Sequence, residues 1–207
     1  MRGPGGRSGG LAISGFQAAI ERAPSFNRAT MRALGVAGVE PETVRLWEAV
    51  DEGDEAAVRR CVAAGASASA ANRMGLTALH RAAAAGAAPI ARALAAELGG
   101  ALDKGDRVGT TALGVAAGRG HTSVVEALLE LGADAAPRRE DGATALHLAC
   151  AAGHVGCALA ILRERGEDAA GAAVADREGF SPLDHLEQAG LKGADAAQLA
   201  ELRATLA

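Results

Sequence analysis

The side chains best suited to catalysis or metal binding gather in one short segment. His147 and Cys150 stand three residues apart, a spacing that would place both on one face of a helix, where a Cys–His pair could act as base and nucleophile. His154 and Cys157 follow with the same spacing, and zinc prefers ligands of these two types. Neither pair has the spacing of a known zinc motif. Two interpretations therefore compete: reactive groups, or core residues of a helix.

Other kinds of chemistry have less support. The chain contains no GxxxxGK[ST] loop for phosphates, and Asp184 and His185 have no obvious nucleophile beside them. Its three cysteines, Cys61, Cys150 and Cys157, form no CxxC motif and cannot all pair, which favours a reduced intracellular compartment. A formal net charge of −4 gives no electrostatic case for nucleic acid. We therefore expect no catalytic residue, no cofactor, no metal and no nucleic-acid partner.

The elements that hold these side chains follow from a repeat. Four glycines are each followed two residues later by a hydroxyl residue and two further on by leucine. The glycines are Gly75, Gly109, Gly142 and Gly179, the hydroxyl residues Thr77, Thr111, Thr144 and Ser181, and the leucines Leu79, Leu113, Leu146 and Leu183. The period is 34, 33 and then 37 residues, and a half-matching copy lies upstream around Trp47 and Gly53. Such a period is typical of stacked repeat proteins.

Each copy has the features of a helix pair. Thr or Ser before a helical run caps the helix by accepting a backbone N–H, and Gly86 ends the first helix where a positive φ is needed. A second apolar run then ends at another glycine. Abundant alanine allows neighbouring helices to approach closely, so that stacked copies bury each other's apolar faces. Cys150 takes the position of Ala83 and Ala117 in other copies, which favours core packing over chemistry; Trp47 is expected in the core too.

Three segments carry a family resemblance. GLTALHRAAAAG, GTTALGVAAGRGH and GATALHLACAAGH resemble the ankyrin-repeat motif, with its Thr-x-Leu-His tetrapeptide and Gly-His turn. The resemblance extends over about residues 43–190 and implies an all-α solenoid of paired antiparallel helices with protruding β-hairpin-like fingers. It also implies that His80 and His147 hydrogen-bond the capping Thr and nearby backbone. Two departures are Gly114, in the place of these histidines, and Ala87, in the place of the His of Gly-His.

The repeat divides the chain into two parts. Residues 1–42 have no period and form a low-complexity segment that we expect to be disordered, with a helix over residues 16–34 as an option. Residues 43–207 form the repeat domain, with an N-capping copy at 43–71, further copies at 72–105, 106–138 and 139–175, and a C-capping copy at 176–207. Leu199, Leu202 and Leu206 lie on one side of an expected final helix.

A rigid stack presents an extended binding surface, and the resemblance implies that it recognises other proteins through its fingers and inner helices. The expected partner-binding residues are Arg73, Met74, Leu76, Arg107, Val108, Thr110, Arg119, Arg139, Glu140, Asp141, Arg177, Glu178 and Phe180. The four finger arginines of this set, Arg73, Arg107, Arg139 and Arg177, recur one unit apart and could clamp carboxylates of one extended segment, with Met74, Val108 and Phe180 as apolar anchors. A solvated arginine-rich edge without a ligand is the alternative.

We expect a non-catalytic protein-interaction module or adaptor that acts as a monomer. The alternative is a regulatory or targeting module of an enzyme whose catalytic part lies elsewhere. No apolar run reaches the length of about eighteen residues that a membrane span needs. We expect a cytoplasmic protein, with the nucleus as an alternative; the five arginines and single acid of residues 1–36 leave an organellar transit peptide open as well.

Overall fold

Helices account for all the regular structure that the computed structural model describes, within residues 40–98, 101–137, 139–165, 174–189 and 196–206. These helices are α3 (Pro41–Glu52), α4 (Glu55–Ala63), α5 (Ala78–Ala85), α6 (Ala88–Leu98), α7 (Ala112–Arg119), α8 (Thr122–Glu130), α9 (Ala145–Ala151), α10 (Val155–Arg165), α11 (Pro182–Gln188) and α12 (Ala196–Leu206). Apart from an isolated bridge between Ala71 and Thr77, no β pairing joins the described residues.

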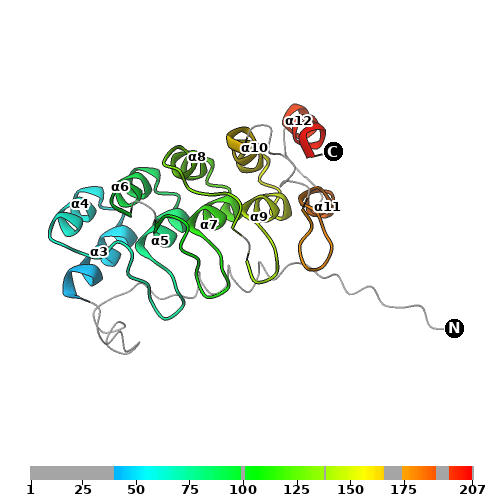
Figure 1. Cartoon of the computed structure of the whole chain (residues 1–207). Helices are drawn as coiled ribbons and strands as arrows, with labels where there is room; N and C mark the ends of the chain where they lie inside the picture. Colours follow the sequence, from blue (N-terminus) through cyan, green and yellow to red (C-terminus); the bar gives the residue numbers. More distant parts are fainter. Residues whose placement is uncertain (1–39, 99–100, 138, 166–173, 190–195, 207) are drawn as a thin grey trace.

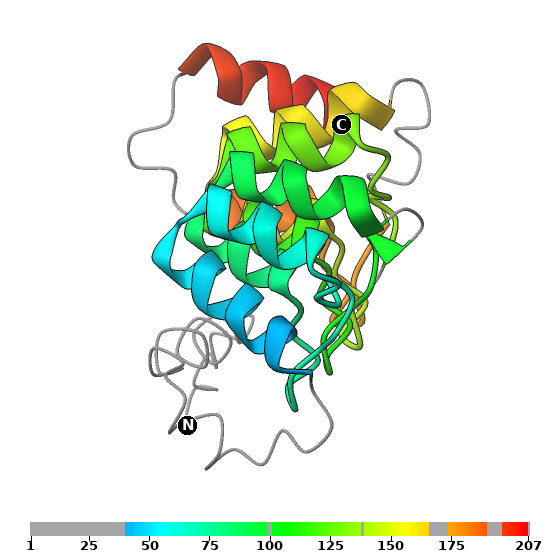
Figure 2. The ribbon, with the colours of Figure 1, turned by 90° about the vertical axis from the view of Figure 1, so that its left-hand side faces the viewer.

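The helices form two stacked layers (Figures 1 and 2). Helices α3, α5, α7, α9 and α11 pack against one another in an inner layer, and α4, α6, α8, α10 and α12 do the same in an outer layer. The described part of each long loop from an outer helix to the next inner helix projects beyond the inner layer as a finger. The all-α stack of helix pairs expected from the repeat is therefore confirmed.

Local sequence determines where the inner helices begin and end. The hydroxyls of Thr77, Thr111 and Ser181 each accept a hydrogen bond from the backbone N–H three residues on, which satisfies an orphan donor of the first turn. Gly86 ends α5 with a φ of 71°, in the left-handed region where glycine carries no steric cost. The helix boundaries thus follow from the motif that repeats in the sequence.

The core lies between the two layers and is built mainly from alanine, leucine and valine. Leu79, Leu113 and Leu146 are buried in successive inner helices. The residues next to them have small side chains, so the helices can pack closely. Trp47 and Cys150 are both buried in this core, as expected. The copies therefore stabilise one another through continuous apolar contact along the stack.

The expected division into domains stays a prediction. Residues 1–39, and with them the suggested helix over 16–34, lie outside the described part of the chain. The same is true of residues 166–173, which precede the last copy. The final helix is present as α12, and Leu202 on it is buried.

Candidate functional site

The fingers are tight turns held by a side chain at their first position. Asn72, Asp106 and Asp176 each present one carboxamide or carboxylate oxygen, Oδ1, to two backbone N–H groups of their own turn. The oxygen-to-nitrogen distances lie between 2.8 and 3.0 Å. This is the local hydrogen bonding by which Asx residues favour turns. It fixes the finger tips that follow.

Backbone hydrogen bonds tie each finger to the next. The N–H of Arg107 donates to the carbonyl of Met74 at 3.0 Å, and the N–H of Glu140 donates to the carbonyl of Val108 at 3.0 Å. The last link runs from the N–H of Arg177 to the carbonyl of Asp141 at 2.9 Å. Four finger tips therefore form one connected edge, which we call the finger edge and define by residues 73–74, 107–108, 140–141 and 177–178.

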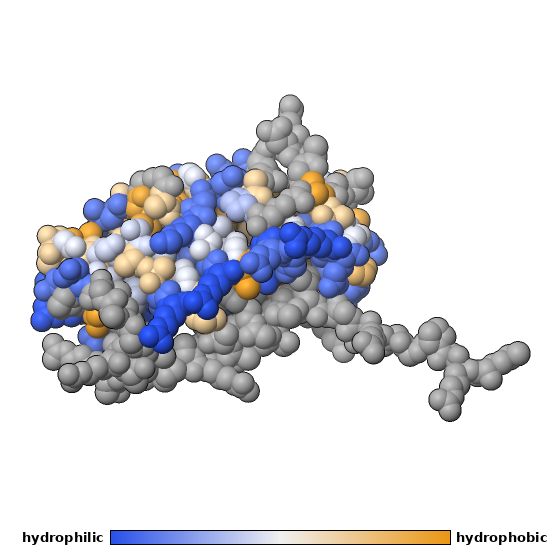
Figure 3. Space-filling model, turned by 60° about the horizontal axis from the view of Figure 1, so that its bottom comes forward, coloured by the Kyte–Doolittle hydropathy of each residue, from blue (hydrophilic) through white to orange (hydrophobic). Residues whose placement is uncertain are grey.

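Most of the finger-edge residues expected to meet a partner are exposed. The exposed residues are Arg73, Met74, Arg107, Val108, Glu140, Arg177 and Glu178. Met74 is 50% exposed and Val108 is 36% exposed. Together with Leu131, these two are the large apolar side chains that stand out as exposed among the described residues. Figure 3 shows a hydrophilic band across this side of the molecule, with apolar patches beside it. The edge thus combines charge with apolar surface.

The residue just before each capping Thr or Ser lies deeper than expected. Thr110 is only 1% exposed, so the expectation that it meets a partner is contradicted. Its methyl group fills the space left by Gly114, where a Cβ would lie 3.2 Å from Thr110 Cγ2. Leu76 is half-buried, and the ring of Phe180 lies 5.6 Å from that of His185, so neither projects as the finger tips do.

Arg139 does not belong to the arginine row, and the expected four-arginine register is wrong. Its N–H donates to the carbonyl of Ala143, as the first residue of every finger does, so Arg139 takes the place of Asp106 and not of Arg107. Its side chain is 12% exposed and pairs with Asp141 at 3.4 Å. Counting back two residues from Gly142 gives Glu140 as the true equivalent of Arg107.

The inner helices line the surface beside the fingers with small side chains. Ala84, Gly118 and Ala151 occupy equivalent positions on α5, α7 and α9 and are partly buried. Arg119 is also partly buried, and its Nη1 donates to the carbonyl of Ala84 at 3.1 Å. Arg119 therefore joins neighbouring copies in addition to any role toward a partner.

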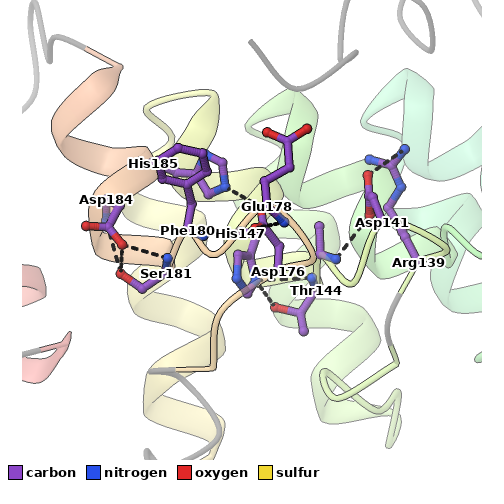
Figure 4. Close-up of polar contacts among 11 residues, drawn as sticks. Arg139, Asp141, Thr144, His147, Asp176, Glu178, Phe180, Ser181, Asp184 and His185 are labelled. Atoms are coloured by element: carbon purple, nitrogen blue, oxygen red, sulfur yellow. Dashed lines mark hydrogen bonds and ion pairs between the residues drawn. The ribbon is translucent and has the colours of Figure 1, made fainter. Parts of the chain in front are cut away.

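A buried polar cluster anchors the last finger (Figure 4), and its central carboxylate was not singled out by sequence reasoning. The Asp176 side chain is 1% exposed and accepts a hydrogen bond from His185 Nε2 at 2.9 Å. Burial raises the pKa of Asp176, but this bond and the backbone N–H donors of Phe180 and Glu178 outweigh burial and hold the pKa below its usual value. The sequence does contain a signal for this residue: an Asn or Asp stands three positions before each of Gly75, Gly109 and Gly179.

Of the side chains that first suggested chemistry, His147, Cys150 and Cys157 are buried in the stack. Burial raises the pKa of the Cys150 thiol to about 12, so the thiolate that a nucleophile or zinc ligand requires is disfavoured at neutral pH. His80 Nδ1 accepts the N–H of Thr77 at 3.2 Å, while its Nε2 lies 3.0 Å from the carbonyl of Thr110. Within the described ranges, no three His, Cys, Asp or Glu side chains gather closely enough to hold a metal ion.

Comparison with known families agrees with this geometry. A model of three ankyrin-repeat copies matches residues 46–139, and a model of a single ankyrin repeat matches residues 141–171. None of the helices in the described part of the chain is long and apolar enough to cross a membrane. The two matches cover more than half of the 207 residues; they include most of α3 and all of α4 to α10, while α11 and α12 lie outside them. The chain belongs to the ankyrin-repeat family.

Proposed function

We propose that this protein is a non-catalytic adaptor that binds a segment of another protein along its finger edge. Ankyrin repeats generally mediate contacts between proteins. The observation that carries the proposal is the exposure of Met74 and Val108 on adjacent fingers, each directly after an exposed arginine. Apolar surface rimmed by polar residues marks interaction sites, and arginine is enriched among the residues that dominate the binding energy of interfaces.

The exposed arginines and the exposed apolar side chains should contribute differently to the free energy of binding. An exposed arginine–carboxylate contact contributes only about 0–1 kcal/mol, so Arg73, Arg107 and Arg177 cannot supply high affinity alone. Burial of Met74 and Val108 against a partner adds about 25 cal/mol per Å² of apolar surface removed from water. We therefore infer that the apolar pair supplies most of the affinity, while the arginines raise the association rate and select acidic partners.

Affinity capture from native lysate with the full chain tests the proposal. Replacing Arg73, Arg107 and Arg177 with Glu should abolish or strongly reduce capture of the partners that the wild type retains. The matched control replaces Arg59, Arg92 and Arg163 with Glu, which makes the same charge change on exposed positions of the outer helices. Equal capture by the finger variant and the wild type would mean that the finger edge is only a solvated surface.

A second candidate function is a regulatory or targeting role for a separate enzyme. Recovery of one enzyme in stoichiometric amount would favour this role, because a dedicated module forms a defined complex. Recovery of several partners in smaller amounts would favour the adaptor. The same capture experiment therefore separates the two functions once the recovered proteins are quantified.

A further inference from the structure

The two halves of the finger edge differ in charge. On the first half, Arg73 and Arg107 each precede an exposed apolar residue, so that this half is basic and apolar. On the second half, Glu140 takes the place of an arginine, and Glu178 takes the place of Met74 and Val108. The exposed side chains there are Glu140, Arg177 and Glu178, while Asp141 is paired with Arg139. The second half is therefore weakly acidic and lacks an exposed apolar tip.

The spacing of the fingers sets the spacing of a ligand. Packed helices lie about 8–10 Å apart, so fingers that join successive stacked helices recur at about this distance. An extended chain advances about 3.3 Å per residue. A segment that lies along the edge therefore meets a new finger about every three residues, and the backbone links between fingers keep this interval constant.

We propose that the bound segment is bipolar: two acidic residues about three positions apart, each beside an apolar residue, followed about three positions later by a basic residue. The acidic part faces Arg73 and Arg107 and covers Met74 and Val108, and the basic residue faces Glu140. This inference rests on the proposed function, because it specifies the ligand of the same surface. It predicts charge order, whereas the proposed function requires only that the edge binds.

Three fluorescent peptides test the charge order by anisotropy at low ionic strength, where exposed charge pairs are least screened. The first contains two Asp-Leu pairs three residues apart and a Lys three residues after the second Asp; the second reverses this order, since either chain direction is compatible with the edge. The third replaces the Lys with Asp. A uniformly basic edge would bind this third, most negative peptide best. We expect one bipolar peptide to bind the wild type about three- to tenfold more tightly than the all-acidic peptide.

Two variants identify the residue responsible. Glu140→Lys should reverse the preference, so that the all-acidic peptide binds more tightly than the bipolar one. Glu126→Lys, the same change on the exposed face of α8, should keep the wild-type preference. The inference is overturned if the all-acidic peptide binds the wild type at least as tightly, if Glu140→Lys leaves the preference unchanged, or if no peptide binds. None of these outcomes decides the proposed function, which depends on the capture experiment.

Discussion

At the residue scale, His80 and His147 work as neutral hydrogen-bonding groups inside the stack. His80 Nδ1 accepts from the backbone of Thr77, so the ring proton must lie on Nε2, where it can reach the carbonyl of the next copy. His147 makes the equivalent contact with the backbone N–H of Thr144 at 3.2 Å. A second proton on either ring would place N–H against N–H. The motif therefore depends on the uncharged imidazole.

Stability should consequently fall as the solution becomes mildly acidic. Burial, before any other cause, lowers the pKa of His80, His147 and His154 below the usual 6.5. The unfolded chain then binds protons at these residues before the folded chain does, so their contribution is complete above about pH 6.5 and is lost as pH falls toward the folded pKa values. Urea unfolding midpoints at pH 7.5, 6.5 and 5.5 should decrease in that order. Constant or rising midpoints would contradict the neutral roles of these rings.

The exposure of the finger arginines follows from their distance to a glycine of the motif. Arg73, Arg107 and Arg177 each stand two positions before such a glycine and are exposed. Arg139 was assigned to their row because of its residue type, although it stands three positions before Gly142. In these tight turns the residue that closes the turn and the exposed residue at its tip are neighbours in sequence, here Arg139 and Glu140. Residue type alone could not reveal this difference.

At the element scale, the inner helices are short because their neighbours stabilise them. Helix α9 spans Ala145–Ala151, well below the length at which an isolated helix is stable in water. Leu146 on this helix is 2% exposed, and α9 contacts α7 on one side and α11 on the other. Helix identity and core positions could be predicted because they follow the period. The deeper position of Thr110 could not, because it depends on the space beside Gly114.

Leu146→Ala should therefore destabilise the stack by about 2–5 kcal/mol, the cost of a cavity in a well-packed core. The measurement is equilibrium unfolding in urea, followed by circular dichroism. Leu131→Ala is the matched control, because Leu131 is 39% exposed and its truncation should change stability by less than about 0.5 kcal/mol. A change below about 0.5 kcal/mol for Leu146→Ala would contradict the register of the repeat.

The junction between the first two copies lacks a contact that the next two junctions have. The His121 ring packs on Gly86, where a Cβ would lie 2.7 Å from Nδ1, and its Nε2 lies 3.2 Å from the carbonyl of Ala84. His154 packs in the same way on Gly120. At the first junction Ala87 takes the place of histidine, and a Cβ at Gly53 would meet nothing within 4 Å. This junction therefore has room for an imidazole.

Ala87→His should stabilise the protein by about 0.5–1.5 kcal/mol at neutral pH, through one new hydrogen bond and closer packing on Gly53. His121→Ala removes the equivalent contact and should destabilise the protein by a similar amount. The melting temperatures of both variants, compared with that of the wild type in thermal unfolding, measure these two changes in stability. If Ala87→His lowers the melting temperature, the copies are not equivalent at this turn.

At the scale of the whole molecule, the proposed function depends on a connected row of fingers. The net charge of −4 would repel an acidic partner at long range, so the local arginines must attract it. Binding should weaken as salt rises, mainly because association slows, while dissociation changes little. Surface plasmon resonance with a partner recovered by capture would measure both rates. A salt effect confined to dissociation would argue against steering by the finger arginines.

Apolar anchors should have the opposite kinetic signature. Met74→Ala and Val108→Ala together should mainly raise the dissociation rate of the same partner, because they remove apolar contacts that form only after docking. Ala cannot perturb the core at these exposed positions, so unfolding midpoints serve as the control for folding. An unchanged dissociation rate would show that the partner does not cover these two side chains.

The most direct test of the account is to locate a bound partner by hydrogen–deuterium exchange. We predict that a partner recovered by capture slows exchange in the finger segments 73–76, 107–110, 140–143 and 177–180 of the full chain. Exchange in the outer helices α4, α6 and α8 should stay unchanged, because they lie in the layer away from the fingers. Protection confined to the outer helices, with none in the fingers, would contradict the claim that the finger edge is the binding surface.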